Sequence, residues 1–316
     1  MQNLIVSTSP HAHAPLTTRR VMLDVLIALS PAAVASVILY GLKALIILAV
    51  CVGASFISEF LFNLAAKKEQ TVYDLSAIVT GVILALTLPA TANIWHCAVG
   101  SVFAIIVVKC LFGGLGCNFA NPAATARVML LVAFSGAIAG GVAPTDKFVN
   151  TADVVSSATP LAIIKSGSEE LPSLLDMLLG NRAGAIGEGC AVALIIGFAY
   201  LVYRGIIKWY VPTAYVATVF LLSLLVLGSF KLALYEVLGG GLLIAAVFMI
   251  TDYVSTPLRP LGKLVFAIGT GLITVLIRFW GSYPEGVSFA ILLMNILSPY
   301  VDKLCEKKPF GKGCNK

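Results

Sequence analysis

The segment from Asp153 to Pro160, DVVSSATP, places three hydroxyl side chains between an acid and a proline in a chain that is otherwise mostly apolar. A threonine directly before a proline is typical of a helix N-cap, because the hydroxyl oxygen accepts a hydrogen bond from a free N–H group and proline suits the first helical position. The same N–H groups and the positive end of the helix dipole would favour a phosphate on Thr159. A cap needs only one hydroxyl, so the segment is consistent with an ordinary cap, with a phosphate-bearing threonine, or with both.

Three acids, Asp24, Glu59 and Glu236, lie inside long apolar runs. An acid at bilayer depth is costly and marks a candidate site for ion movement. We expect Asp24 and Glu236 to help a cation or a proton to cross the membrane. Glu59 is a third candidate, although its closeness in sequence to Lys67 and Lys68 also fits an interfacial position.

Four further charged residues, Lys109, Arg127, Glu188 and Arg278, fall near the ends of apolar runs. Glu188 stands in the sequence GEG at the expected start of a helix, where the dipole favours an acid. That placement and a functional role are equally consistent with the sequence.

The stretch FGGLGCNFANPA, residues 112–123, contains three glycines and an Asn-Pro pair. These residues break helices, and the break falls near one expected membrane face. The stretch is either an ordinary loop between two helices or an unwound segment that lines a cavity.

The composition identifies a membrane protein. Apolar residues make up 59% of the 316 residues and charged residues 11%, whereas soluble domains carry about 25% charged residues. The apolar runs are about 20 residues long, which favours helices over a barrel. We therefore expect an all-α integral membrane protein of about ten transmembrane helices, at residues 21–41, 43–63, 75–90, 95–112, 123–143, 186–206, 212–230, 232–251, 262–280 and 285–302.

The basic residues are distributed unequally over the two sides of this topology. Fifteen of the 21 lysine and arginine residues lie on the side that holds both termini, which the positive-inside rule places in the cytoplasm. The chain then divides into a cytoplasmic tail (1–20), a first membrane half (21–143), an external loop with Thr159 (144–185), a second membrane half (186–302) and a cytoplasmic tail (303–316). We expect membrane lipids around it and no nucleic-acid partner.

The seven cysteines form no CxxC pair and no Cys/His pair with metal spacing. Most lie in or beside apolar runs, where a cysteine usually acts as a small hydrophobic residue. We expect no metal site.

Residues 81–130 can be aligned with residues 240–293. Each stretch has a glycine-rich helix, a turn with proline, a second helix that ends near a basic residue (Lys109 or Arg278), and a third helix after a break. The two copies would start on opposite sides of the membrane, so we expect an inverted repeat of five plus five helices. Such repeats place ligands near the midplane.

The segment Asp153–Thr159 fits the motif D-x-x-(S/T)-(G/S)-A-T, and with it the chain resembles the NqrB/RnfD family. That family comprises NqrB of the sodium-pumping NADH:quinone oxidoreductase and RnfD of the related Rnf complex. The resemblance covers nearly the whole chain, including YDLSAIVTGVILALTLPATA (73–92), KCLFGGLGCNFANPAATAR (109–127) and GSYPEGVSFAILLMNILSPYVD (281–302). The short segment before the first span is more similar to the Rnf branch. Ala120 departs from the family, in which a bulky aromatic residue is expected.

The resemblance implies that FMN is bound covalently through its phosphate to Thr159. Asp153, Ser156, Ser157 and Ala158 would then form the recognition sequence for a separate flavin transferase. It also implies a second, non-covalent flavin, riboflavin, for which the broken stretch 112–123 is a candidate site. The implied location is the bacterial plasma (inner) membrane, and the implied partners are the other Rnf subunits (RnfA, RnfB, RnfC, RnfE and RnfG), especially the FMN-bearing RnfG.

Two functions follow as hypotheses. In the first, the chain is a flavin-bearing electron-transfer subunit of an ion-translocating ferredoxin:NAD+ oxidoreductase that moves sodium ions or protons, and it has no catalytic residue of its own. The alternative is a secondary transporter or channel without a redox cofactor, because ten helices in an inverted repeat with buried acids would suit one as well.

Overall fold

The computed structural model describes residues 17–138, 140–142, 156–166, 171–281, 283 and 285–306. Helices dominate this part of the chain, and the only strands in it are two residues long each: β1 (Gly141–Val142) and β2 (Ser156–Ser157). The predicted all-α class is confirmed.

The first helix, α1 (Thr18–Ala65), contains 48 residues and is broken at Gly41, whose φ of 65° and ψ of −148° are not helical. Thr17 caps its start by accepting a hydrogen bond from the Arg20 N–H group at 3.4 Å. A positive φ is readily adopted by glycine alone, so Gly41 sets the position of the break. The two segments of α1 coincide with the predicted spans 21–41 and 43–63.

The other helices of the first half are short. They are η1 (Val72–Asp74), α2 (Ser76–Thr87), α3 (Ile94–Val102) continuing as η2 (Phe103–Cys110), α4 (Pro122–Ala133) and α5 (Ser135–Ile138). The 12 residues of α2 span about 18 Å, less than the roughly 30 Å of a bilayer core. The predicted spans 75–90 and 123–143 were therefore too long. Leu88, which precedes Pro89, is extended (φ −86°, ψ 151°) and ends α2.

The rest of the chain contains three further long helices, α9 (Tyr210–Leu227), α12 (Pro260–Trp280) and α13 (Val287–Leu304). After α6 (Pro160–Ser166), α7 (Leu174–Leu179) and η3 (Ile186–Glu188) come α8 (Ala191–Tyr203), α9, α10 (Phe230–Leu238), α11 (Leu242–Ile244) with η4 (Ala245–Met249), α12 and α13. The predicted span 232–251 is broken, because α10 meets α11 and η4 at 63°. Gly240 and Gly241 form the break with φ of 65° and 67°.

Four helices of the described residues are long and apolar enough to cross a membrane, or five if the bent pair counts as one span. In that count α1 is one helix, although it contains two predicted spans. The predicted spans 212–230, 262–280 and 285–302 overlap the three other long helices, and 232–251 overlaps the bent pair. The remaining four predicted spans overlap shorter apolar helices. The chain is a multi-pass membrane protein in which several helices are too short to cross alone.

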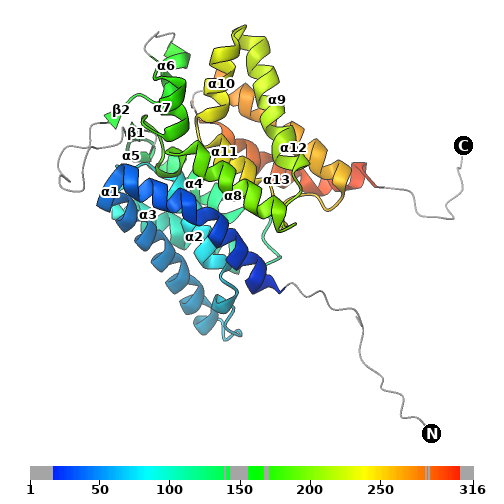
Figure 1. The fold of residues 1–316 in the computed structure, drawn as a ribbon. Coiled ribbons are helices and arrows are strands. Elements are labelled where there is room, and N and C mark those ends of the chain that lie inside the picture. The colour runs from blue at the N-terminus through cyan, green and yellow to red at the C-terminus, as the bar shows by residue number, and fades with distance from the viewer. Residues whose placement is uncertain are drawn as a thin grey trace, which may run out of the picture.

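Both halves pack against α1. A Cβ at Gly81 on α2 would lie 2.8 Å from the Cys51 carbonyl oxygen, and a Cβ at Gly197 on α8 would lie 2.4 Å from the Ala28 carbonyl oxygen. Small residues allow such close backbone approach between membrane helices. Figure 1 shows α8 lying between α1 and the helices of the second half, so the two halves form one bundle.

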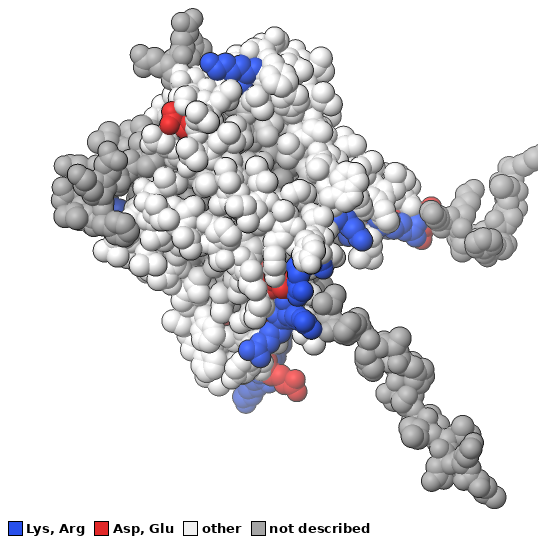
Figure 2. Space-filling view, viewed as in Figure 1, with Lys and Arg blue, Asp and Glu red and all other residues white. Residues whose placement is uncertain are grey.

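The surface is apolar except at its ends. Large apolar side chains such as Ile38, Leu61, Ile196 and Leu225 are more than half exposed, as expected for a surface that contacts lipid. In Figure 2 most visible lysine and arginine side chains lie at the lower right, where α1 begins and α13 ends in Figure 1. The segment with α6, α7, β1 and β2 lies at the opposite, upper end.

The order of elements agrees with the proposed internal alignment. Residues 81–130 contain the end of α2, then α3 with η2, and then the start of α4; residues 240–293 contain α11 with η4, then α12, and then the start of α13. The inverted orientation of the two copies stays a prediction.

Candidate functional site

Thr159 lies directly before α6, at a position that the backbone fixes closely. Strand β2 pairs antiparallel with β1, with Ser157 opposite Gly141, and brings the chain to Thr159. The Thr159 Oγ1 atom accepts a hydrogen bond from the Ala162 N–H group at 3.3 Å, and the Thr159 carbonyl accepts one from Ile163 at 3.0 Å. The expected N-cap is confirmed, and the side chain is 7% exposed.

The structure describes three of the other four motif residues, Ser156, Ser157 and Ala158. Asp153 lies outside the described residues. Ser156 and Ser157 form β2, so their main chain pairs with Val142 and Gly141. Ala158 is exposed and lines a cleft together with Pro160, which puts the residues on both sides of Thr159 at its rim.

This cleft encloses about 360 Å³ and is lined by Ala158, Pro160, Ile163, Leu171, Pro172, Arg182 and Ala183. The Tyr235 hydroxyl donates a hydrogen bond to the Pro172 carbonyl, which ties the cleft wall to α10. Most of the lining is apolar, and Arg182 supplies its charge.

Arg182 stands in the loop between α7 and η3 and is 4% exposed. Its Nη2 atom donates to the carbonyl oxygens of Glu188 (3.2 Å) and Leu238 (2.5 Å). Its Nε and Nη1 atoms are buried and have no hydrogen-bond partner among the described residues. The sequence did not single out this arginine, because a lone basic residue in a polar loop gives no signal until the fold brings it to the cleft.

Glu59 and Lys109 form a buried ion pair. The Lys109 Nζ atom lies 2.7 Å from Glu59 Oε1, and both side chains are at most 2% exposed. Lys109 also donates to Ser76 Oγ at 2.6 Å, and Thr71 donates to the same Glu59 oxygen at 2.7 Å. The carboxylate of Glu59 is therefore buried inside the protein and paired with Lys109, and its depth in the membrane stays a prediction.

Glu236 is paired with Arg278 at the end of α10. The Arg278 Nη1 atom lies 2.9 Å from Glu236 Oε2 and 2.6 Å from the Glu236 carbonyl oxygen, and Nη2 lies 3.1 Å from the Gly239 carbonyl oxygen. Because Arg182 binds the Leu238 carbonyl, two guanidinium groups satisfy the last carbonyls of this helix.

Asp24 is buried on α1 and contacts α8. Its carboxylate accepts hydrogen bonds from the Tyr200 hydroxyl (2.9 Å) and from Arg204 Nη2 (3.0 Å). All three acidic candidates for ion movement are thus buried and paired with a cation: Asp24 and Glu59 lie near opposite ends of α1, and Glu236 lies on α10.

Glu188 is buried in η3 and faces a small cavity shared with Arg127 and Glu285. The Arg127 Nη2 atom lies 3.1 Å from Glu285 Oε2. Glu188 itself precedes α8 by three residues and has no cation within salt-bridge distance among the described residues. Glu188 therefore differs from an exposed acid at the start of a helix, because its carboxylate is buried in a polar cavity.

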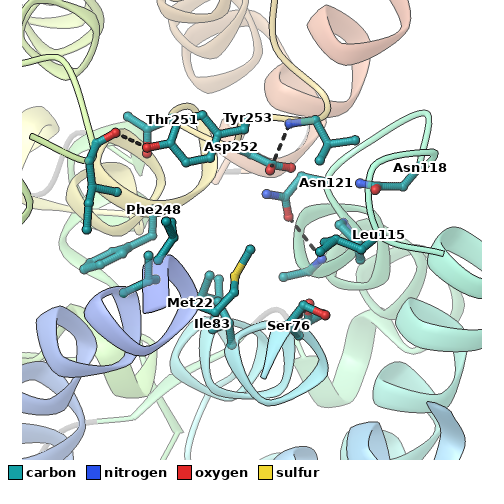
Figure 3. Close-up of a pocket in the computed structure, with 18 of the residues that line it drawn as sticks. Met22, Ser76, Ile83, Leu115, Asn118, Asn121, Phe248, Thr251, Asp252 and Tyr253 are labelled. Atoms are coloured by element: carbon teal, nitrogen blue, oxygen red, sulfur yellow. Dashed lines mark hydrogen bonds between the residues drawn. The ribbon is translucent and has the colours of Figure 1, made fainter. Parts of the chain in front are cut away.

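The stretch 112–123 lines a second cavity, shown in Figure 3, which confirms the cavity-lining alternative. Leu115, Asn118 and Asn121 form one wall, and Asp252 lies near them (Figure 3). The Tyr253 ring lies on the other side of the cavity, where its hydroxyl donates a hydrogen bond to the Ile206 carbonyl. Most of the apolar lining comes from α1, α2 and the π-helix η4, including Met22, Ile83 and Phe248, and α8 adds Leu201. Ala120, the departure from the family, is fully buried.

The polar groups of this cavity come from its loops. Asn121 Oδ1 accepts hydrogen bonds from Ala123 and Ala124 N–H groups, both at 3.1 Å, and so caps α4. Its NH2 group has no partner among the described residues. Burial raises the pKa of the Asp252 carboxyl, although hydrogen bonds from Ser255 and the Val254 N–H group oppose that rise. The cavity thus offers amide and carboxyl groups on the side of Asn118, Asn121 and Asp252, and hydroxyl and apolar side chains around the rest of its wall.

Comparison with known sequences matches residues 5–311 to the sequence model of the NQR2, RnfD, RnfE family. The chain belongs to the NQR2, RnfD, RnfE family. The match covers both membrane halves, the loop with Thr159 and the cavity of Figure 3.

Relatives within this family match over their full length. The chain is 44% identical to the D subunit of the Na+-translocating ferredoxin:NAD+ oxidoreductase complex of Acetobacterium woodii, over 98% of this chain and 96% of that one. It is 35% identical to the D subunit of the proton-translocating ferredoxin:NAD+ oxidoreductase complex of Clostridium ljungdahlii, over 97% and 96%. It is 33% identical to the D subunit of the ion-translocating oxidoreductase complex of Mannheimia succiniciproducens, over 97% of each chain. The resemblance to the Rnf branch is confirmed.

Proposed function

We propose that this chain is RnfD, the membrane electron-transfer component of an ion-translocating ferredoxin:NAD+ oxidoreductase complex, and that it carries FMN esterified to Thr159. The observation that carries the proposal is the full-length likeness to the D subunits of two such complexes. It favours a redox subunit over a solute transporter. The chain acts within the complex and is not catalytic alone.

The surroundings of Thr159 support an attached flavin. A phosphoester uses the Oγ1 atom, and the backbone on both sides of that atom is fixed by the β1–β2 pair and by α6. The adjoining cleft of about 360 Å³ falls within the range of roughly 300–1,000 Å³ typical of ligand sites. FMN, when bound, passes one or two electrons, while the protein supplies position and electrostatics.

The charge distribution supports the orientation of the site. The basic end of the molecule in Figure 2 holds the start of α1 and the end of α13, and the cleft lies at the other end. The protein lies in the bacterial inner membrane. By the positive-inside rule, both termini lie on its cytoplasmic side and Thr159 lies on its outer side. The partners are the other Rnf subunits (RnfA, RnfB, RnfC, RnfE and RnfG), especially RnfG, and a flavin transferase that recognises the motif from Asp153.

The cavity of Figure 3 is the proposed site of a non-covalent flavin, riboflavin. Its Asn118 and Asn121 amides suit the alternating carbonyl and N–H groups at one edge of the ring, and its apolar walls suit the ring itself. The cavity encloses about 100 Å³, so a ring system would require side chains to turn aside. Met22 is suited to that, because methionine has three rotatable bonds.

Asp24, Glu59 and Glu236 remain the proposed ion-pathway acids. Glu59 differs from Asp24, whose two carboxylate oxygens both accept hydrogen bonds. Glu59 Oε2 is buried without a partner among the described residues and is therefore an oxygen that a cation or proton could use. Measuring ion uptake by vesicles with the whole complex, with Na+ present or absent, tests Glu59→Gln against the parent chain. Unchanged coupled uptake would remove Glu59 from the pathway.

In-gel flavin fluorescence tests the covalent attachment. The chain is coexpressed with its flavin transferase as the parent, as Thr159→Ala, and as Thr213→Ala, a matched change in an exposed threonine at the start of α9. We expect fluorescence in the parent and in Thr213→Ala and none in Thr159→Ala. Equal fluorescence in all three would refute Thr159 as the acceptor.

A further inference from the structure

We propose that Arg182 is the counter-ion of the phosphate that joins the flavin to Thr159. This inference rests on the proposed flavin attachment and adds a residue outside the flavinylation motif. It assigns Arg182 a positioning role, since it would hold the phosphate and not take part in electron transfer.

Arg182 differs from the other buried cations of the described residues. Lys109, Arg127 and Arg278 are equally buried, and each has a carboxylate oxygen within about 3 Å. Arg182 has no carboxylate within salt-bridge distance in the part of the chain that the structure describes. The Glu188 carboxylate acts on Arg182 only from beyond salt-bridge distance. A buried charge without an anion in direct contact is unfavourable, so an anion bound there would stabilise the chain.

The hydrogen bonds of Arg182 leave two of its three nitrogen atoms without an acceptor among the described residues. One nitrogen, Nη2, donates to two main-chain carbonyls, and the Nε and Nη1 groups have no acceptor among the described residues. Glu188, six residues further along the chain, offers its carbonyl to Arg182, while its carboxylate lines the cavity with Arg127 and Glu285. Two donors of one guanidinium group remain available to the same ligand.

The cleft brings Arg182 to the acceptor threonine. Ala158 and Pro160, which flank Thr159, line the cleft together with Arg182 and the adjacent Ala183. The Thr159 loop also packs on the chain after Arg182, because Gly141 lies against both Thr159 and the main chain of Ala183 and Gly184. A phosphodiester carries one negative charge and two non-bridging oxygens, and a guanidinium group with two free N–H donors matches both.

The competing explanation is that Arg182 only caps α10 through the Leu238 carbonyl. A cap would stabilise the chain equally with and without the flavin. A phosphate counter-ion would stabilise the flavin-loaded chain, whereas in the unloaded chain its uncompensated charge would be a cost.

Thermal unfolding of the full-length chain in detergent separates the two roles. The parent and Arg182→Gln are each produced with and without the flavin transferase, and the covalent flavin content is measured by fluorescence and intact mass. Glutamine keeps one NH2 group for the carbonyls but removes the charge. We expect Arg182→Gln to lower the Tm of the loaded chain by about 3–8 °C relative to the loaded parent and to leave the Tm of the unloaded chain unchanged or higher.

Two further variants complete the test. Arg182→Lys keeps the charge, so the decrease in Tm of its loaded form should be less than half of the decrease for Arg182→Gln. This variant also provides a test if Arg182→Gln does not fold. Arg259→Gln, a half-exposed arginine that donates to the Cys305 carbonyl at the other end, should shift both forms equally. An equal loss of Tm in loaded and unloaded Arg182→Gln would overturn the phosphate assignment and leave the cap. Absence of flavin from the parent would instead overturn the proposed function.

Discussion

Gly141 and Thr159 are in such close contact that a Cβ atom at position 141 would lie 2.5 Å from Thr159 Cγ2. The same Cβ would lie 3.2 Å from the Gly184 nitrogen, so Gly141 is held between the proposed flavin acceptor and the loop that follows Arg182. Gly141 therefore limits the position of Thr159 by shape, in addition to the β1–β2 pairing at Ser157 and the hydrogen bond from the Ile163 N–H group to the Thr159 carbonyl.

Gly141→Ala should displace Thr159 while leaving the membrane helices in place. Relieving a 2.5 Å contact needs a shift of about 1 Å, and a misplacement of that size lowers the rate of a positioned reaction by up to about 100-fold. The initial rate of flavin attachment, followed by in-gel fluorescence, measures the effect. Gly136→Ala is the matched control, because a Cβ there meets nothing within 4 Å. The same rate in both variants would show that the contact does not position Thr159.

The Glu59–Lys109 pair should behave as a coupled unit. Glu59→Gln leaves a buried ammonium without its anion, which costs about 3–5 kcal/mol of unfolding free energy. Adding Lys109→Met removes that charge, so the double variant should be more stable than Glu59→Gln alone. Thermal unfolding followed by circular dichroism gives the comparison. Losses that simply add would mean that the two residues do not stabilise each other.

Arg278→Lys should destabilise the bend between α10 and α11 despite keeping the charge. An ammonium group cannot reach the Glu236 carboxylate and the carbonyls of Glu236 and Gly239 with the geometry of a guanidinium. Loss of one or more charged hydrogen bonds predicts a cost of about 2–3 kcal/mol. Arg259→Lys, at a half-exposed site, should stay within about 0.5 kcal/mol, and an equally small effect at Arg278 would contradict the account of the bend.

Asn121→Ser should distinguish two roles of Asn121, the N-cap of α4 and the proposed amide contact in the cavity of Figure 3. Serine also accepts hydrogen bonds at an N-cap, so the stability should change little, but the NH2 group that faces the cavity is removed. We expect less non-covalent flavin in the purified complex, measured by extraction and fluorescence, with the covalent flavin unchanged. A full complement of non-covalent flavin in Asn121→Ser would argue against an amide contact.

The sequence predicted the class of fold and the location of each apolar helix, because hydrophobicity is a local property of each segment. It did not predict that α2 stops at Thr87 or that the span 232–251 bends at Gly240. Those details depend on Pro89 and on paired glycines in close contact with other elements, and a window of average hydrophobicity does not register them.

The sequence likewise predicted some parts of the candidate site and not others. The motif that ends at Thr159 and the broken stretch with Asn121 could be found from sequence, because their residue types occur together. The partners of the buried acids could not be found, since Glu59 and Lys109 are 50 residues apart. Arg182 could not be found from sequence either. It stands out only because no carboxylate of the described residues lies within salt-bridge distance of it, and that depends on the three-dimensional fold.

The mass of the peptide that contains Thr159, taken from the complex purified after coexpression with its flavin transferase, tests the central claim most directly. The account predicts an increase equal to FMN minus one water, located by fragmentation on residue 159 and absent from Thr159→Ala. An unmodified residue 159 in a complex that is fully assembled and active would contradict it.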